Sequence, residues 1–304
     1  MSSETSVNAN DNASARKTFS GKTFAEVDHF INASNDYIFC KYWKPAGEPR
    51  ALILIIHGFG EHSGRYSIMA PKFTELGFLV FSNDHYCHGE SDGYRLDIAD
   101  YQVFLRDLKQ HCSIMKEKYP NLPLFVLGHS MGGALACLFV HQNPDLAKHV
   151  VLSSPMIAKN KELTRTKLFL MRLFSSTFPH MPVGSLDTKL ISRDMQQVKK
   201  YDTDPLVYHN KVLLRTAISI SELFDDTEKI LPEITFSFFV LHGDRDGMCD
   251  VSGSKMLHEL AKSTDKTIKI FPGGYHELVH DIEPTSSEYA SCIVDWLKER
   301  LPKC

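Results

Sequence analysis

A Gly-x-Ser-x-Gly pattern at the junction of two predicted elements constrains this chain more than any other feature. Gly128, Ser130 and Gly132 follow an apolar run at 123–127, typical of a buried strand, and precede a helix-forming stretch at 134–141. A serine at such a junction is held on a sharp, strained turn with its hydroxyl exposed above the sheet. The strand and helix approach so closely that the flanking positions must lack side chains. The pattern therefore indicates a nucleophilic serine, the alternative being a serine that only caps the helix.

Further apolar runs alternate with amphipathic segments along the chain. Predicted buried strands occupy residues 51–56, 78–82, 149–152, 235–241 and 267–271. Predicted helices occupy residues 64–76, 101–118 and 288–300. Before them, two alternating runs between residues 23 and 43 flank a turn cluster and predict a β-hairpin. The alternation predicts an α/β fold with a mostly parallel, doubly wound sheet and right-handed crossovers.

The alternation lapses between residues 157 and 230, which are helical and irregular in pattern and contain no clear buried strand. We interpret this stretch as a helical cap inserted over the sheet, between core segments 21–156 and 231–304. Residues 1–20 are rich in Ser, Asn, Asp and Ala, and this composition predicts a disordered tail.

Composition excludes several classes of function. The formal net charge of the 304 residues is -3, which gives no global field for recruiting nucleic acid. Seven cysteines at irregular spacing favour free thiols in a reducing compartment. The start of the chain lacks the basic-then-apolar pattern of a secretory signal, and no apolar run approaches the roughly 20 residues needed to span a bilayer. These features predict a cytoplasmic protein.

Polar residues follow four of the predicted strands, where ligands bind in parallel sheets. A serine hydroxyl needs an imidazole base and a carboxylate that orients it, and this architecture supplies them in the order Ser, Asp, His. His276, after two glycines, is favoured as the base over His280. The acid is Asp246, Asp244 or Asp250, all in one loop, and spacing favours Asp246.

Acyl transfer also requires donors for a tetrahedral oxyanion. The backbone N–H groups of Met131, directly after the serine, and of Phe59, in the loop 57–60, are the candidates. His57, His62, His85 and His88 lie near one another in sequence, but their spacing matches no known metal-binding pattern. We therefore expect no metal and no cofactor.

The chain resembles the monoglyceride lipases of the α/β-hydrolase superfamily from about residue 37 to the final helix. The most specific of the matching stretches is the ten-residue run from His57 to Tyr66. The others are Tyr42-Trp43-Lys44-Pro45, Asp84-His85 with His88-Gly89, Leu127 to Gly133, Tyr201 with Asp204-Pro205-Leu206, and Lys266 to Ile270 with Tyr275-His276.

The resemblance implies roles for individual residues. It implies Ser130, Asp246 and His276 as a catalytic triad, and so favours Asp246 over the neighbouring aspartates. Phe59 and Met131 fall on oxyanion-hole positions. Four more residues are implied in substrate binding: Glu61, Arg65 and Tyr201 at the glycerol pocket, and Cys249 near the leaving group. The chain departs from the family pattern at Phe59, where a small residue is usual, at Cys87, where glycine is common, and at Val279, often polar.

The implied activity is hydrolysis of monoacylglycerols to fatty acid and glycerol through an acyl-serine intermediate. A lysophospholipase or another carboxylesterase is the enzymatic alternative. A catalytically silent α/β-hydrolase that serves as a binding module is the alternative of another class.

The segment from residue 157 to 182 combines large apolar and basic side chains. Its apolar residues include Leu163, Leu168, Phe174 and Phe178, and its basic residues are Lys159, Lys161, Arg165, Lys167 and Arg172. Such a helix suits a membrane interface, the alternative being a cap helix packed on the loops of the sheet. We expect a lid that contacts the membrane surface and admits an acyl chain, making the protein peripherally membrane-associated.

Overall fold

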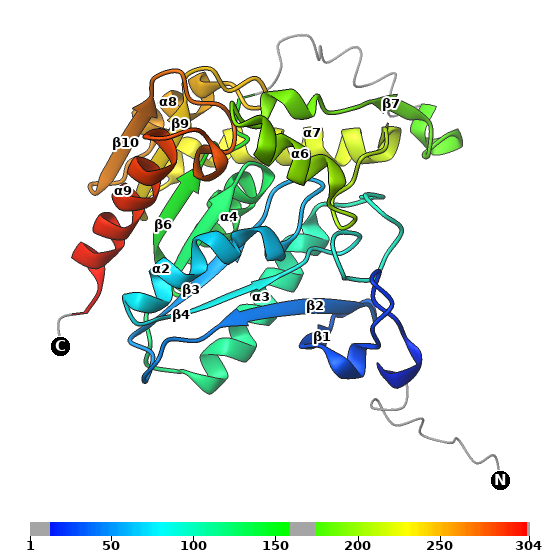
Figure 1. Cartoon of the computed structure of the whole chain (residues 1–304), viewed down its shortest axis with the longest axis horizontal. Coiled ribbons are helices and arrows are strands. Elements are labelled where there is room, and N and C mark those ends of the chain that lie inside the picture. The colour runs from blue at the N-terminus through cyan, green and yellow to red at the C-terminus, as the bar shows by residue number, and fades with distance from the viewer. Residues whose placement is uncertain (1–12, 159–173, 303–304) are drawn as a thin grey trace.

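The architecture is a twisted eight-stranded sheet with helices on both faces, seen in a computed structural model that describes residues 13–158 and 174–302 (Figure 1). In spatial order the strands are β1 (His29–Ile31), β2 (Tyr37–Trp43), β4 (Phe78–Asn83), β3 (Ala51–Ile56), β5 (Leu124–His129), β6 (Ala147–Ser153), β9 (Ser237–Gly243) and β10 (Lys266–Phe271). Strand β2 runs antiparallel to both β1 and β4. The other strands of this sheet are mutually parallel, namely β4, β3, β5, β6, β9 and β10. The predicted α/β class and the amino-terminal hairpin are confirmed.

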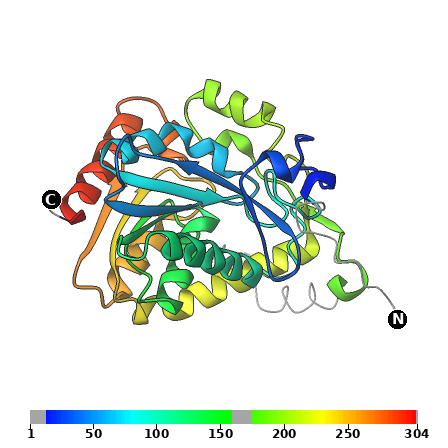
Figure 2. The ribbon, with the colours of Figure 1, turned by 90° about the horizontal axis from the view of Figure 1, so that it is seen from below.

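The sheet is covered on both faces because its central strands are apolar at successive positions. Every residue of β3, β4 and β5 is buried, as expected for parallel strands between two helical layers. Alternate β3 side chains enter different cores. Leu52 and Leu54 pack with α3 (Gln102–Lys118), α4 (Met131–Gln142) and α8 (Val251–Leu260). Ala51 and Ile53 pack with α2 (Ala70–Glu75) and α9 (Thr285–Arg300). The two layers lie on opposite sides of the sheet in Figure 2.

The helices of the core are η1 (Phe24–Glu26), η2 (Ser63–Ile68), α2 (Ala70–Glu75), α3 (Gln102–Lys118), α4 (Met131–Gln142), η4 (Leu231–Glu233), α8 (Val251–Leu260), η5 (Leu278–His280) and α9 (Thr285–Arg300). Most of them lie between successive strands, while η1 precedes the first strand and η5 and α9 follow the last one. The single helix predicted at 64–76 is instead η2 followed by α2. Pro71, at the start of α2, lacks the N–H that a continuous helix would use at that point.

The cap segment follows β6 and lies above the carboxyl ends of the parallel strands (Figure 1). Its described elements are β7 (Pro182–Gly184), η3 (Thr188–Leu190), α6 (Met195–Thr203), β8 (Val212–Leu213) and α7 (Leu214–Ile230). Helix α7 packs along α4, and Leu223 joins the core cluster on that face. The apolar and basic residues predicted to form a membrane-contacting helix between 159 and 173 lie outside the described residues. No helix within the described ranges is long and apolar enough to cross a bilayer.

The end of the predicted tail takes part in the described structure. Ala13 is buried beside Phe24 and Tyr37, and Arg16 forms an ion pair with Asp92. Lys17 bridges to Thr23. Residues 13–20 therefore pack on the hairpin that opens the sheet.

Candidate active site

The candidate nucleophile Ser130 lies at the turn between β5 and α4. Its backbone has φ +53° and ψ −120°, a conformation that L-residues seldom adopt. A Cβ on Gly128 would lie 2.3 Å from the carbonyl oxygen of Gly132, and a Cβ on Gly132 would lie 2.0 Å from that of Ile56. Both glycines are therefore required sterically, and the strained turn projects Ser130 beyond the end of the sheet.

The carboxylate of Asp246, in the loop after β9, faces the imidazole of His276, in the loop after β10. Asp246 Oδ2 lies 2.7 Å from His276 Nδ1 and 3.1 Å from His242 Nε2. Asp246 Oδ1 accepts the backbone N–H groups of Met248 and Cys249 at 2.8 and 2.9 Å. Burial disfavours this carboxylate, but the two facing histidines and the hydrogen bonds hold the pKa of Asp246 well below its usual range.

Because Nδ1 of His276 donates to an ionised carboxylate, Nε2 is left free to accept a proton. Burial disfavours the imidazolium, but the charge and hydrogen bond of Asp246, together with the charges of Glu277 and Glu61, outweigh burial and raise the pKa of His276 above its ordinary value. Ser154 Oγ donates to the carbonyl of His276 at 2.8 Å and so fixes the backbone that carries the ring. Ser130, Asp246 and His276 line one cavity of about 780 Å³.

The rival candidates make other contacts. Asp244 Oδ1 accepts the N–H of Gly273 at 2.6 Å, which joins the two loops rather than orienting an imidazole. Asp250 caps the amino terminus of α8. His280 Nδ1 lies 3.0 Å from Glu277 Oε2. The structure brings only Asp246, among these three aspartates, to the imidazole of His276.

The loop after β3 carries the candidate oxyanion donor Phe59. His57 Nε2 accepts the backbone N–H of His85 at 2.9 Å, so its proton resides on Nδ1, which donates to the carbonyl of Gly58 at 2.9 Å. Burial lowers the pKa of His57 to about 3, which keeps the ring neutral. That hydrogen bond orients the Gly58–Phe59 peptide, whose N–H belongs to Phe59. The N–H of Met131 lies in the first turn of α4, where helices leave donors unpaired.

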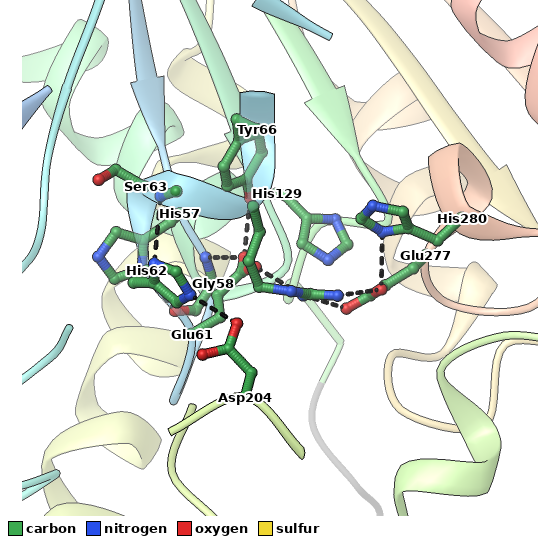
Figure 3. Close-up of polar contacts among 12 residues, drawn as sticks. His57, Gly58, Glu61, His62, Ser63, Tyr66, His129, Asp204, Glu277 and His280 are labelled. Carbon is green, nitrogen blue, oxygen red and sulfur yellow. Dashed lines mark hydrogen bonds and ion pairs between the residues drawn. The ribbon is translucent and has the colours of Figure 1, made fainter. Parts of the chain in front are cut away.

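Glu61, Arg65 and Glu277 form a buried cluster of three charged side chains. Figure 3 labels its two carboxylates, Glu61 and Glu277. Arg65 Nη1 donates to Glu61 Oε2 at 2.8 Å and to Glu277 Oε1 at 2.5 Å, and Nη2 donates to Glu277 Oε2 at 2.7 Å. Glu61 Oε1 also accepts from Gly58 N–H at 2.6 Å and Tyr66 O–H at 2.8 Å. Burial opposes ionisation, but Arg65 holds the pKa values of both carboxyls below their usual range.

The remaining predicted residues also lie at this cavity or beside the cluster. Tyr201 of α6 lines the cavity, and its ring centroid is 4.7 Å from Cζ of Arg65. Cys249 lines it too, with Sγ 3.9 Å from Ser130 Oγ. Burial raises the pKa of this thiol far above its usual value. Arg65 is absent from the described lining of the cavity and borders a smaller one behind the two glutamates.

Three residues at the site were not predicted from the sequence. Glu277 is adjacent to the candidate base, and that position was the available signal. His242, on β9, hydrogen-bonds Ser254 Oγ at 2.7 Å and the Cys249 carbonyl at 3.0 Å, which directs its ring at Asp246. Ser154, after β6, has no distinguishing pattern in the sequence. Within the described residues, no group of three or more His, Cys, Asp or Glu side chains is arranged to hold a metal ion.

Sequence similarity to known proteins identifies the family of this chain. Residues 47–283 match the Hydrolase_4 family, described as serine aminopeptidase S33. The chain is 38% identical to the monoglyceride lipase of Homo sapiens over 291 residues, covering 95% of this chain and 96% of that protein. It is 32% identical to the monoacylglycerol lipase of Mycolicibacterium smegmatis over 259 residues, covering 85% and 92%. The chain belongs to the monoglyceride lipase family.

A solved structure extends the likeness to three dimensions. The monoacylglycerol lipase of Paleococcus ferrophilus superposes with a TM-score of 0.77 at 28% identity, covering 86% of this chain and 98% of that one. The α/β-hydrolase fold predicted from the sequence is therefore confirmed.

This member of the monoglyceride lipase family departs from the expected pattern at three places. Phe59 is half-buried and lines the cavity, so its ring narrows the space beside the nucleophile. Cys87 has φ +61°, a conformation that suits the glycine common there. Val279 borders the smaller cavity, next to Glu277 and its partner His280.

Proposed function

We propose that this protein is a serine hydrolase that cleaves monoacylglycerols to free fatty acid and glycerol. The observation that carries the proposal is the 2.7 Å contact between Asp246 and His276, in the cavity that Ser130 also lines. The polar lining of that cavity includes Glu61 and Glu277. Its apolar lining suits an acyl chain and includes Met156, Leu186, Ile191, Val212, Ala217, Ile220 and Phe224.

Acylation of the serine uses groups already positioned. Ser130 Oγ attacks the ester carbonyl while Nε2 of His276 takes its proton, and Asp246 stabilises the resulting imidazolium. The N–H groups of Phe59 and Met131 bind the oxyanion of the tetrahedral intermediate. Collapse of the intermediate breaks the bond to the alkoxy oxygen, to which His276 gives the proton, and glycerol departs.

Deacylation repeats these steps with water. His276 takes a proton from water, the hydroxide attacks the acyl-serine, and Ser130 recovers its proton as the fatty acid leaves. No step requires a metal or an organic cofactor.

The test is fatty-acid release from monooleoylglycerol, diolein, triolein and lysophosphatidylcholine, beside the Ser130→Ala variant. We expect monooleoylglycerol to be preferred and kcat of the variant to fall on the order of 10⁶-fold. Preference for the lysophospholipid would replace the substrate class but keep the nucleophile. Absence of hydrolysis of any ester by the wild-type protein would favour a binding module.

We also propose that the cap contacts a membrane surface. Five large apolar side chains of its described part are between 39% and 58% exposed: Phe174, Phe178, Met181, Val183 and Leu186. They lie within β7 or on either side of it in the chain, and they follow the apolar, basic stretch at 159–173 in sequence. Lone exposed apolar residues are common, but several together mark an interaction surface.

Flotation with anionic liposomes tests this contact. We expect Phe178→Asp to reduce the floating fraction, because a charge at the interface opposes insertion of the apolar group. Ile114→Asp is the matched control, since Ile114 is 40% exposed on α3, away from the cap. Equal flotation of the two variants and the wild-type protein would contradict the proposal.

A further inference from the structure

The Glu61–Arg65–Glu277 cluster carries one more negative charge than positive. Its carboxylate side chains are each 5% exposed and the Arg65 side chain is 11% exposed. Three hydrogen bonds commit the guanidinium to the two carboxylates, and the Tyr201 ring lies over it. The negative charge of the two carboxylates therefore exceeds the positive charge of Arg65 before any ligand binds.

The described lining of the cavity at Ser130 also contains more acidic than basic residues. Its described lining contains the acidic residues Glu61, Asp244, Asp246, Asp250 and Glu277, and among the described lining residues none is lysine or arginine. Glu61 and Glu277 line this cavity, whereas Arg65 borders the smaller cavity behind them. An ester that places its alcohol part beside Glu61 and Glu277 contacts these carboxylates rather than the guanidinium of Arg65.

The chemistry of the two glutamates distinguishes between headgroups. Hydroxyl groups can donate to carboxylate oxygens, which have spare acceptor capacity. A phosphate carries about −1.5 to −2 charges and is repelled by them. Inside a partly dehydrated cavity that repulsion is larger than it is in water.

We propose that Glu277 is a specificity-determining residue that, with Glu61, selects esters of uncharged polyols and excludes esters whose headgroup carries a phosphate. The inference rests on the proposed function and deepens it. It assigns the discrimination to charge at the alcohol end of the cavity, not to the fit of the acyl chain.

The variant Glu277→Gln tests this assignment. Glutamine has nearly the same shape and can still accept a hydrogen bond from Arg65, which keeps Glu61 as its ion-pair partner. The substrates are monooctanoylglycerol and its 3-phosphate, both as monomers in solution so that membrane binding plays no part. The readout is kcat/KM for the phosphate ester divided by kcat/KM for the neutral ester, which cancels any equal effect on the chemical step.

We expect the wild-type ratio to be low and Glu277→Gln to raise it on the order of 10-fold, because one charge close to the headgroup is removed. Glu277→Asp keeps the charge and is expected to keep the wild-type ratio. Glu117→Gln makes the same substitution on an exposed residue of α3, at the edge of the sheet opposite the site, and is expected to change nothing.

Two outcomes would overturn the inference. One is an unchanged ratio in Glu277→Gln. The other is an equal rise in Glu277→Asp, which would assign the effect to packing. Failure of the proposed function is distinguishable, since the wild-type protein would then cleave ethyl octanoate but not monooctanoylglycerol. Inhibition of ethyl octanoate cleavage by glycerol 3-phosphate would still test the charge, and an unchanged inhibition constant in Glu277→Gln would refute it.

Discussion

At the residue scale, the basicity of His276 is set by its neighbours. Burial alone would lower its pKa, because a buried imidazolium loses hydration. The charge and hydrogen bond of Asp246 and the charges of Glu277 and Glu61 together outweigh burial. The pKa of His276 therefore lies above its ordinary value of about 6.5.

We predict that kcat/KM falls as the pH is lowered through this raised pKa, because only neutral His276 accepts the proton of Ser130. Glu277→Gln removes a charge that raises the pKa, so the acidic limb of the profile moves to lower pH. The measurement is kcat/KM for a soluble ester between about pH 5 and pH 9, with Glu117→Gln as control. A limb that moves to higher pH in Glu277→Gln would contradict the assignment.

At the scale of elements, the turn between β5 and α4 depends on missing side chains. We predict that Gly132→Ala destabilises the protein by several kcal/mol, since its Cβ would overlap backbone atoms of β3 that cannot move aside. Thermal unfolding is the measurement. Gly47→Ala is the control, because a Cβ there meets nothing within 4 Å. Equal melting temperatures for the two variants would refute the steric argument.

Helix α3 carries a buried carboxyl that opposes stability at high pH. Asp107 is 2% exposed and is hydrogen-bonded to Asn32 Nδ2 at 3.4 Å. Burial raises its pKa to about 7. The unfolded value is about 3.9, so the folded state binds a proton more tightly and stability falls as pH rises from about 4 to about 7.

We predict that Asp107→Asn removes this loss. The variant and the wild-type protein have similar stability near pH 4, where both side chains are neutral, and the variant is more stable by a few kcal/mol near pH 8. Urea unfolding at the two pH values measures the difference. A stability difference that does not grow with pH would show that burial does not disfavour the ionised form of Asp107.

At the scale of the whole molecule, contacts between the cap and the core hold the loop that carries His276. Arg193, between η3 and α6, donates through Nε to Asp281 Oδ1 and Oδ2 at 2.9 and 3.0 Å. Asp281 Oδ2 also accepts the N–H of Tyr275, the residue before the base, at 3.1 Å. The Asp281 side chain is fully buried. The cap thereby helps to fix the position of the candidate base.

We predict that Arg193→Leu destabilises the protein on the order of 3 kcal/mol, because a buried carboxylate loses its charged partner. Asp281→Asn in the same chain restores part of the loss by removing the unpaired charge. Urea unfolding of the single and double variants at about pH 7 measures both effects. A double variant less stable than Arg193→Leu would contradict an electrostatic cause.

Most elements of the fold, and the polar residues that follow four of its strands, could be predicted from the sequence. Continuous apolar runs predict buried strands, and the two glycines around Ser130 predict the sharp turn there. Both signals are local, because they depend on burial and on sterics between neighbouring residues. Chain order and position after a strand favoured Asp246 and His276 as the acid and the base, and the family resemblance favoured Asp246 over its neighbours. The break between η2 and α2 was not predicted, although Pro71 in the sequence is a residue that interrupts helices.

The contacts between these groups could not be predicted, because they form only in the folded chain. Arg65 was predicted to line the polar pocket, but Glu277, 212 residues away in sequence, binds its guanidinium. His242 and Ser154 support the site through contacts that no spacing reveals. Charges and hydrogen bonds act through space over a few ångströms, and strands distant in sequence become neighbours only when the sheet forms. The residue types are therefore set by the sequence, whereas their partners are set by the fold.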